Sequence, residues 1–279
     1  MRSWFWLAVF VLLGFLMVLS GLFLRGRFRE NTEKSVPPPP GVTIRYIHLR
    51  SPEDIQPLGG PLVEPMVYRG FVDLRGLPVA DKKKKFFALV LPSVLLAKRK
   101  LADLRAEVVR ISSEPEVSSE DAMWLEAMLE RYRAEDTTDL LRRMEDHPNS
   151  VVLAQAALES GWGTSRFFRE GNNVFGIWSF DSGEPRLEAG ETRGGKRIFV
   201  KRYPSLGGSI QDYFTTIGRG PYQGFRHART REKNPLILIR HLQRYSELGE
   251  EYIRRLALTI RSNDLGRFDR YELVPGVSR

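Results

Sequence analysis

Residues 154–168 read AQAALESGWGTSRFF, and the acid in the middle of this stretch has unusual neighbours. Glu159 ends a run of small and apolar residues and is followed by Ser-Gly-Trp-Gly. Residues 151–159, VVLAQAALE, are apolar on nearly every side of a helix, which predicts a central buried helix with Glu159 at its C-terminal end. There the acid loses solvation and faces the negative end of the helix dipole, so its pKa should be raised.

A glutamic acid that stays protonated near neutral pH can donate its proton to a leaving oxygen, which is the general-acid role in glycoside hydrolysis. Gly161 and Gly163 permit a tight turn after the helix, and Trp162 offers a flat apolar face. The pattern therefore predicts a proton donor on the wall of a cleft. The alternative is a structural glutamate that caps the helix or forms an ion pair with Arg166.

Two helices are predicted before the central one. Residues 118–135 open with a serine three positions before an aspartate, as capped helices do, and residues 136–147 form a helix that Pro148 stops. Asn149 or Ser150 can cap the central helix. The apolar stripe of the first helix is predicted to be core, and consists of Met123, Trp124, Ala127, Met128 and Leu129.

The sequence further upstream mixes strands with a long helical pattern. Residues 42–77 contain short β-like runs between Pro and Gly turns. Residues 81–111 have apolar residues at helical spacing, with Pro92 inside, so we expect a helix kinked or broken near Leu91.

After Glu159 the helical pattern stops and then returns. Residues 161–195 are rich in glycine and polar residues, which favours loops and a small β-hairpin, with residues 198–205 as its final strand. Helices resume at SIQDYFTTI, NPLILIRHLQRY and EEYIRRLALTIRSN. The fold class is therefore mainly α (α+β), one helical domain with a small β-hairpin lobe at about residues 176–203.

The N-terminal segment is predicted to anchor the protein in a membrane. Residues 4–24 carry no charge and are long enough, at about 1.5 Å per residue, to cross a bilayer core. Residues 25–41, with four consecutive prolines, form a tether, and residues 42–279 form the domain. Arg25, Arg27 and Arg29 follow the span, and by the positive-inside rule they favour a cytoplasmic domain.

Charge and cysteine content narrow the function further. The net charge of +9 favours an anionic partner, but the basic residues are spread along the chain, which argues against nucleic acid. The chain has no cysteine, which excludes disulfides, thiolate catalysis and Cys-ligated zinc. No metal or other cofactor is predicted.

Two ordered blocks, LAQAALESGWGTSRF and GNNVFGIW, resemble the bacterial peptidoglycan N-acetylglucosaminidases of the lysozyme superfamily, and most closely the Bax-type membrane proteins. The segments DKKKKFFALVLPSVLLA, YPSLGGSIQDYFTTIGRGPYQGFR and LQRYSELGEEYIRRLALTIRSNDLGRFD extend the resemblance over about residues 78–269. In the last segment a tyrosine in a short loop precedes a helix that starts with a second tyrosine. The resemblance implies a lysozyme-like fold.

The resemblance also implies roles for single residues. Glu159 matches the general acid, and Tyr245 matches a tyrosine facing the acid that positions water or steadies positive charge. The implied substrate-binding residues are Trp162, Asn172, Asn173, Phe175, Gly176, Trp178 and Tyr213. The two asparagines can instead supply turn geometry, and Tyr245 can be an ordinary core ring.

Some members of this family use a second glutamate on the β-lobe to activate water. The candidates are Glu184, Glu188 and Glu191. Glu188 or Glu191 fits the distance back from Tyr203 best, whereas Glu184 precedes Pro185 in the expected outer turn of the hairpin. Assistance by the 2-acetamido group of the substrate is the alternative.

The implied activity is hydrolysis of the β-1,4 bond after N-acetylglucosamine in peptidoglycan glycan strands. A lytic transglycosylase, a muramidase and a non-catalytic wall-binding protein are the alternatives. Because peptidoglycan lies outside the cytoplasmic membrane, the resemblance places the domain on the extracytoplasmic side, against the local arginine count.

Overall fold

The computed structural model describes residues 43–193 and 195–275. Within these residues the fold is mainly helical with a few short strands, as the sequence predicts. The α-helices are α2 (Val79–Ser112), α3 (Ser119–Tyr132), α4 (Thr137–Arg143), α5 (Asn149–Glu159), α6 (Arg166–Gly171), α7 (Leu206–Arg219), α8 (Gln223–Ala228), α9 (Pro235–Leu238) and α10 (Glu250–Ser262). The 3-10 helices are η1 (Pro52–Asp54), η2 (Ile239–Tyr245) and η3 (Leu265–Arg270). The strands are β1 (Arg45–His48), β2 (Leu62–Val63), β3 (Met66–Arg69), β4 (Arg186–Arg193), β5 (Lys196–Lys201) and β6 (Glu272–Leu273).

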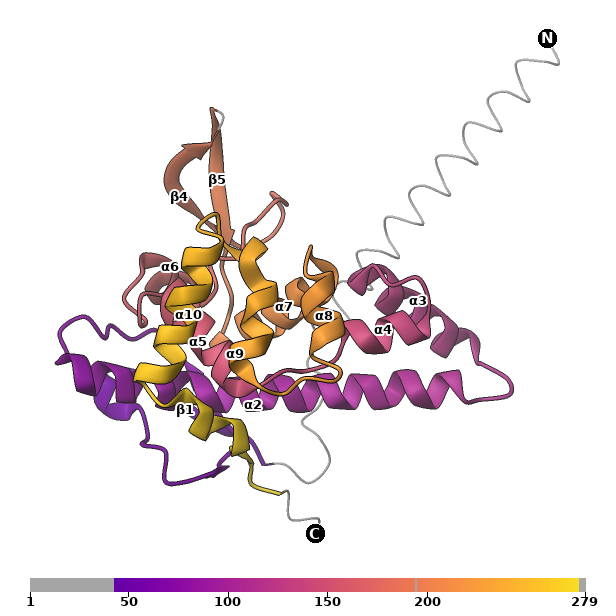
Figure 1. The fold of residues 1–279 in the computed structure, drawn as a ribbon, viewed down its shortest axis with the longest axis horizontal. Helices are drawn as coiled ribbons and strands as arrows, with labels where there is room; N and C mark the ends of the chain where they lie inside the picture. The colour runs from indigo at the N-terminus through magenta and orange to yellow at the C-terminus, as the bar shows by residue number, and fades with distance from the viewer. Residues whose placement is uncertain (1–42, 194, 276–279) are drawn as a thin grey trace. The chain divides into compact units, whose positions relative to one another are not determined.

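Helix α5 is the buried centre of the domain, as its apolar sequence predicts. Its residues from Val151 to Ala157 are buried, and α2, α10 and η3 pack around it (Figure 1). Neither Asn149 nor Ser150 caps the helix. Instead, the carboxylate of Asp269 on η3 accepts bonds from the Ser150 main-chain nitrogen (2.7 Å) and hydroxyl (2.8 Å). An acid distant in sequence thus satisfies a free donor at the helix start.

A kink or a break was expected near Leu91. Helix α2 is continuous through Pro92, so the break is wrong. The 34-residue helix lies beneath α5 and α7 in Figure 1 and contacts both. Proline removes one backbone hydrogen bond, at a cost of about 3 kcal/mol or more. The side chains on both sides of Pro92, from Phe86 to Leu95, are buried, and their packing offsets that cost.

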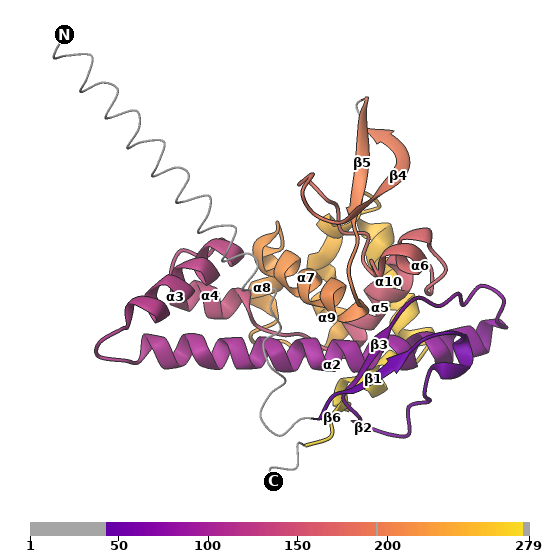
Figure 2. The same cartoon turned by 180° about the vertical axis from the view of Figure 1, so that it is seen from behind.

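The short strands predicted before α2 are present. Strand β1 pairs with β3 in parallel, and β2 pairs with β6. The second pair joins residues near the two ends of the described chain. Figure 2 shows β1 and β3 beside the first half of α2, which β3 contacts.

The β-lobe is the antiparallel hairpin β4–β5, which projects from the helices (Figure 1). Its register shifts between Glu188 and Thr192. The short helix α6 just before it was not predicted, because the many glycines of this region suggested loops alone. Ser165 begins α6 by accepting a bond from the main-chain nitrogen of Phe168 at 3.2 Å.

Two further expectations need correction. Helix α3 starts as predicted, with Ser118 accepting from the Asp121 nitrogen at 3.1 Å, but Met123 of its supposed core stripe is 54% exposed. The segment NPLILIRHLQRY is not one α-helix but α9 followed by the 3-10 helix η2.

Across the described ranges, no helix combines the length and the apolar character needed to cross a bilayer. The predicted span at residues 4–24 lies outside these ranges and stays a prediction.

Candidate active site

The acid of the predicted site stands at an abrupt end of α5. Glu159 is the last helical residue, and the three positions Gly161, Trp162 and Gly163 all have positive φ, at 57°, 61° and 77°. Ser160 holds this turn, since its hydroxyl donates to the Ala156 carbonyl (2.6 Å) and accepts from the Gly163 nitrogen (3.0 Å). The chain turns away directly after Glu159, which leaves the carboxyl partly exposed at the end of a buried helix.

Among the described residues, the Glu159 carboxyl has one hydrogen-bond partner, the hydroxyl of Tyr252 on α10, which donates to Oε1 at 2.8 Å. Burial raises the pKa of Glu159 to about 6, and the bond from Tyr252 opposes that rise. The direction agrees with the sequence-based prediction. An acid with this pKa is poised to give up a proton near neutral pH.

Arg166 does not fill the alternative role of ion-pair partner to Glu159. Its guanidinium lies 3.5 Å from Glu170 and donates to the main-chain carbonyl of Glu188. Arg166 therefore ties α6 to the β-lobe.

Tyrosines surround the acid. The Tyr245 ring stacks on Tyr252, with centroids 5.8 Å apart and planes 7° apart, and lies 5.8 Å from the ring of Tyr222. Burial and the negative charge of Glu159 raise the pKa of Tyr245 well above its usual value, so this hydroxyl stays protonated. Tyr245 thus lies near the acid, but the tyrosine that bonds it is Tyr252. Tyr252 is the second tyrosine of the motif, at the start of this helix, and was not among the site residues predicted from the sequence.

Tyr213 is at the site but cannot touch a substrate in this conformation, because it is 0% exposed. Its hydroxyl donates to Gln155 Oε1 at 2.7 Å, and Gln155 Nε2 donates to the Tyr252 hydroxyl at 3.1 Å. Tyr213 therefore reaches Glu159 only through other side chains.

The loop after α6 is also held from inside. Asn172 and Asn173 are buried; Asn172 donates to the Tyr203 carbonyl at 3.2 Å, and Asn173 donates to the Lys201 carbonyl at 2.8 Å. Phe175 is buried against Tyr213, with ring centroids 4.1 Å apart. These side chains fix the base of the hairpin and shape the backbone beside the acid rather than offer surface to a ligand. Gly176, at φ 64°, has open space where a Cβ would stand.

The two tryptophans of the predicted site differ in setting. Trp162 packs edge-on against Phe86 and Phe87 of α2, with the Lys83 ammonium 4.7 Å from its ring centre. Trp178, at the base of the hairpin, is 40% exposed and lies 6.1 Å from the ring of Phe180, which is 87% exposed. Trp178 and Phe180 therefore form an accessible aromatic pair, and Phe180 was not identified from the sequence.

Of the three acids proposed as a second carboxylate, two lie on β4 of the hairpin and one lies just before it. Glu184 is not in the outer turn as expected. It precedes β4 at the base, where Lys201 lies 3.4 Å from it and 2.9 Å from Asp212. Glu188 is half-exposed on β4, 3.7 Å from Arg197. Glu191 is also on β4, and its side chain lies outside the described part of the structure.

Comparison with known proteins identifies a glycoside hydrolase domain in this chain. Residues 135–265 match the family "Glucosaminidase: Mannosyl-glycoprotein endo-beta-N-acetylglucosaminidase", so the chain carries a domain of the glucosaminidase family. The matched residues include Glu159, Tyr245, Tyr252 and the whole hairpin, and cover a shorter range than the resemblance noted from the sequence.

The chain is similar to three known proteins, two of which are named as a glucosaminidase and a peptidoglycan hydrolase. Protein bax of Escherichia coli is 27% identical over 196 residues, covering 64% of this chain and 69% of that protein. Exo-glucosaminidase LytG of Bacillus subtilis is 27% identical over 149 residues, half of each chain. Peptidoglycan hydrolase FlgJ of Salmonella typhimurium is 35% identical over 104 residues, a third of each chain.

Proposed function

We propose that the protein is a membrane-anchored peptidoglycan hydrolase that cleaves the β-1,4 bond after N-acetylglucosamine, with Glu159 as the general acid. The observation that carries the proposal is the partly exposed Glu159 carboxyl at the end of a buried helix, with its pKa raised to about 6 and one oxygen bonded by Tyr252. The name of the FlgJ relative supports peptidoglycan as the substrate.

The geometry suggests how the proton is delivered. Because Oε1 of Glu159 accepts the Tyr252 hydrogen, the acid proton belongs on Oε2, from which it passes to the leaving glycosidic oxygen. As the bond breaks, the new carboxylate keeps the Tyr252 bond, which is stronger to an ionised acceptor. Tyr245, stacked on Tyr252, would steady the oxocarbenium-like charge or place the water.

The attacking water needs a base or help from the substrate. Glu188 and Glu191 of β4 remain the proposed bases, and the 2-acetamido group of the sugar is the alternative. A hairpin that projects from the helices can close on a bound strand, so the separation at rest need not be the catalytic one.

The accessible rings of Trp178 and Phe180 suit a glycan chain. Sugar rings have apolar faces that pack on aromatic side chains. A lysozyme-like arrangement, with helices on one side and a β-lobe on the other, would let a strand pass between this pair and Glu159.

The proposed anchor at residues 4–24 would hold the domain on the extracytoplasmic side, where peptidoglycan lies. A fusion of alkaline phosphatase after Arg279 tests this orientation. An active fusion supports it, whereas a cytoplasmic fluorescent fusion with no phosphatase activity overturns it.

The activity is tested by digestion of purified cell-wall sacculi, followed by borohydride reduction and mass spectrometry of the fragments. Glucosaminitol ends on oligosaccharides support an endo-N-acetylglucosaminidase. Muramitol ends indicate a muramidase, anhydromuramic ends a lytic transglycosylase, and free N-acetylglucosamine alone an exo-enzyme. Binding to sacculi without new ends would indicate a wall-binding protein.

A further inference from the structure

A line of buried polar side chains leads from a buried arginine to the acid. In order, it consists of Arg229, His147, Tyr213, Gln155 and Tyr252, and we call it the donor chain. All five side chains are buried, although they come from the turn after α8, the α4–α5 loop, α7, α5 and α10. Successive contacts measure 3.4, 2.9, 2.7 and 3.1 Å, and the last bond, to Glu159, measures 2.8 Å.

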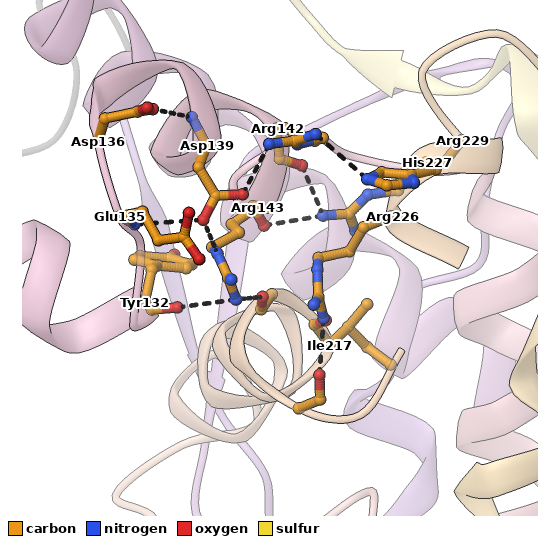
Figure 3. Close-up of polar contacts among 12 residues, drawn as sticks. Tyr132, Glu135, Asp136, Asp139, Arg142, Arg143, Ile217, Arg226, His227 and Arg229 are labelled. Carbon is orange, nitrogen blue, oxygen red and sulfur yellow. Dashed lines mark hydrogen bonds and ion pairs between the residues drawn. The ribbon is translucent and has the colours of Figure 1, made fainter. Parts of the chain in front are cut away.

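The start of the donor chain is a fixed cation. Arg229 Nη2 donates to the main-chain carbonyls of Arg142 (3.3 Å) and Arg143 (2.8 Å) at the end of α4 (Figure 3). Its other terminal nitrogen, Nη1, faces Nδ1 of His147 at 3.4 Å. Burial lowers the pKa of Arg229 to about 10, which leaves it charged at neutral pH. An arginine nitrogen can only donate, so Nδ1 of His147 must accept.

That constraint sets the direction of every later bond. Burial, then the charges of Arg229, Lys98 and Lys233, lower the pKa of His147 well below its usual value, so the ring is neutral. With Nδ1 accepting, its proton is on Nε2 and is donated to the Tyr213 hydroxyl. Tyr213 must then donate to Gln155 Oε1, and Gln155 Nε2 to the Tyr252 hydroxyl.

The reverse amide orientation of Gln155 does not fit. It would direct an NH of Gln155 at the Tyr213 oxygen, which already accepts from His147. The Tyr213 hydrogen would then have no acceptor within the donor chain. It would also present Gln155 Oε1 to the Tyr252 hydroxyl, whose one hydrogen is needed by Glu159. Each hydrogen has one acceptor only when all bonds point toward the acid.

We propose that the donor chain is a positioning device that holds the Tyr252 hydroxyl as a donor to Oε1 of Glu159. His147, Tyr213 and Gln155 act through Tyr252 and need not touch the substrate. The bond stabilises the carboxylate left after proton transfer and keeps the acid proton on Oε2. This inference rests on the proposed function for the role of Glu159 as the acid.

The decisive variant is Tyr213→Phe in the full chain, which cuts the donor chain and keeps the ring stacked on Phe175. The other titratable groups that face Glu159 are Tyr222, Tyr245 and Tyr252. The Tyr213→Phe variant keeps all three side chains. The weakened Tyr252 bond should raise the pKa of Glu159. This pKa is measured by NMR of the labelled side-chain carboxyl carbon, whose signal is assigned with Glu159→Gln. The alkaline limb of the rate profile should move to higher pH, with the plateau rate reduced about three- to tenfold.

The matched control is Tyr132→Phe, which removes the hydroxyl of another buried tyrosine residue, on α3, outside the donor chain. It should leave the Glu159 titration unchanged. Adding Tyr213→Phe to Tyr252→Phe should produce no further shift, because Tyr213 acts only through Tyr252. An unmoved titration in a folded Tyr213→Phe protein, or additive shifts in the double variant, overturns the proposal.

The wild-type protein supplies a test that needs no substrate and does not depend on the Tyr213→Phe variant. The chain has four histidines, and nitrogen NMR distinguishes their two neutral tautomers. His147, assigned with His147→Gln, should carry its proton on Nε2; a proton on Nδ1 overturns the proposal even if Tyr213→Phe fails to fold. If sacculi yield no new ends but the Glu159 titration shifts as expected, the proposed function fails and the donor chain stands.

Discussion

Replacing Glu159 with glutamine should stop catalysis and, at the same time, stabilise the fold at neutral pH. The change is nearly isosteric, and the amide oxygen can still accept from the Tyr252 hydroxyl. It removes the proton that the acid donates, and loss of general acid catalysis costs about two to four orders of magnitude in rate. The clearing of peptidoglycan by this variant should therefore be nearly absent.

The gain in stability follows from the pKa of Glu159, which burial raises from 4.5 to about 6. The folded protein holds this proton more tightly than the unfolded chain does. The contribution of Glu159 to the free energy of unfolding is therefore complete below 4.5, the pKa of this acid in the unfolded chain. It is lost as the pH rises through the folded-state pKa of about 6. At 1.36 kcal/mol for each tenfold change in proton affinity, the ionised acid costs about 2 kcal/mol. Glutamine cannot ionise and avoids this cost.

Urea unfolding at about pH 4 and about pH 7.5 measures the effect. Relative to wild type, Glu159→Gln should gain about 2 kcal/mol in free energy of unfolding between the two conditions. Glu126→Gln, on the exposed side of α3, is the control and should show no such gain. If the difference between Glu159→Gln and wild type is the same at both pH values, burial does not raise the pKa of this acid. If a folded variant clears peptidoglycan normally, Glu159 is not the acid.

Tyr252→Phe should reduce kcat by more than Tyr245→Phe does, because of these two tyrosines it is Tyr252 whose hydroxyl bonds the acid; equal losses on sacculi would contradict this. Trp178→Ala should raise KM for glycan strands with little change in kcat, and an unchanged KM would remove the ring from the binding surface. Asp269→Ala should lower the free energy of unfolding by about 2 kcal/mol, because it leaves the Ser150 donors unpaired. Urea unfolding that matches wild type would refute the role of Asp269 as the cap of α5. Glu184, Glu188 and Glu191 are each replaced by glutamine, and one of the three variants should hydrolyse peptidoglycan far more slowly than the other two. Wild-type rates in all three would favour the acetamido mechanism.

The amino-acid sequence by itself determines the features that rest on local pattern. The unbroken apolar run before Glu159 predicts a buried helix ending in an acid, and α5 is that helix. Glycine and turn residues predict the hairpin, and β4–β5 forms it. The motif blocks around Glu159 are sufficient for the glucosaminidase assignment. These features are encoded within short segments, where spacing alone decides which side chains share a face.

Only the tertiary structure decides which distant groups meet. The hydroxyl that bonds Glu159 comes from 93 residues away, and the carboxylate that caps α5 comes from 119 residues away. Packing on both sides of Pro92 keeps α2 continuous where the local rule predicts a kink or a break. Tyr213 looked like a substrate contact in its motif but is buried at the centre of a hydrogen-bonded line. Burial and hydrogen-bond direction depend on every element packed around a side chain, and spacing along the sequence does not contain that information.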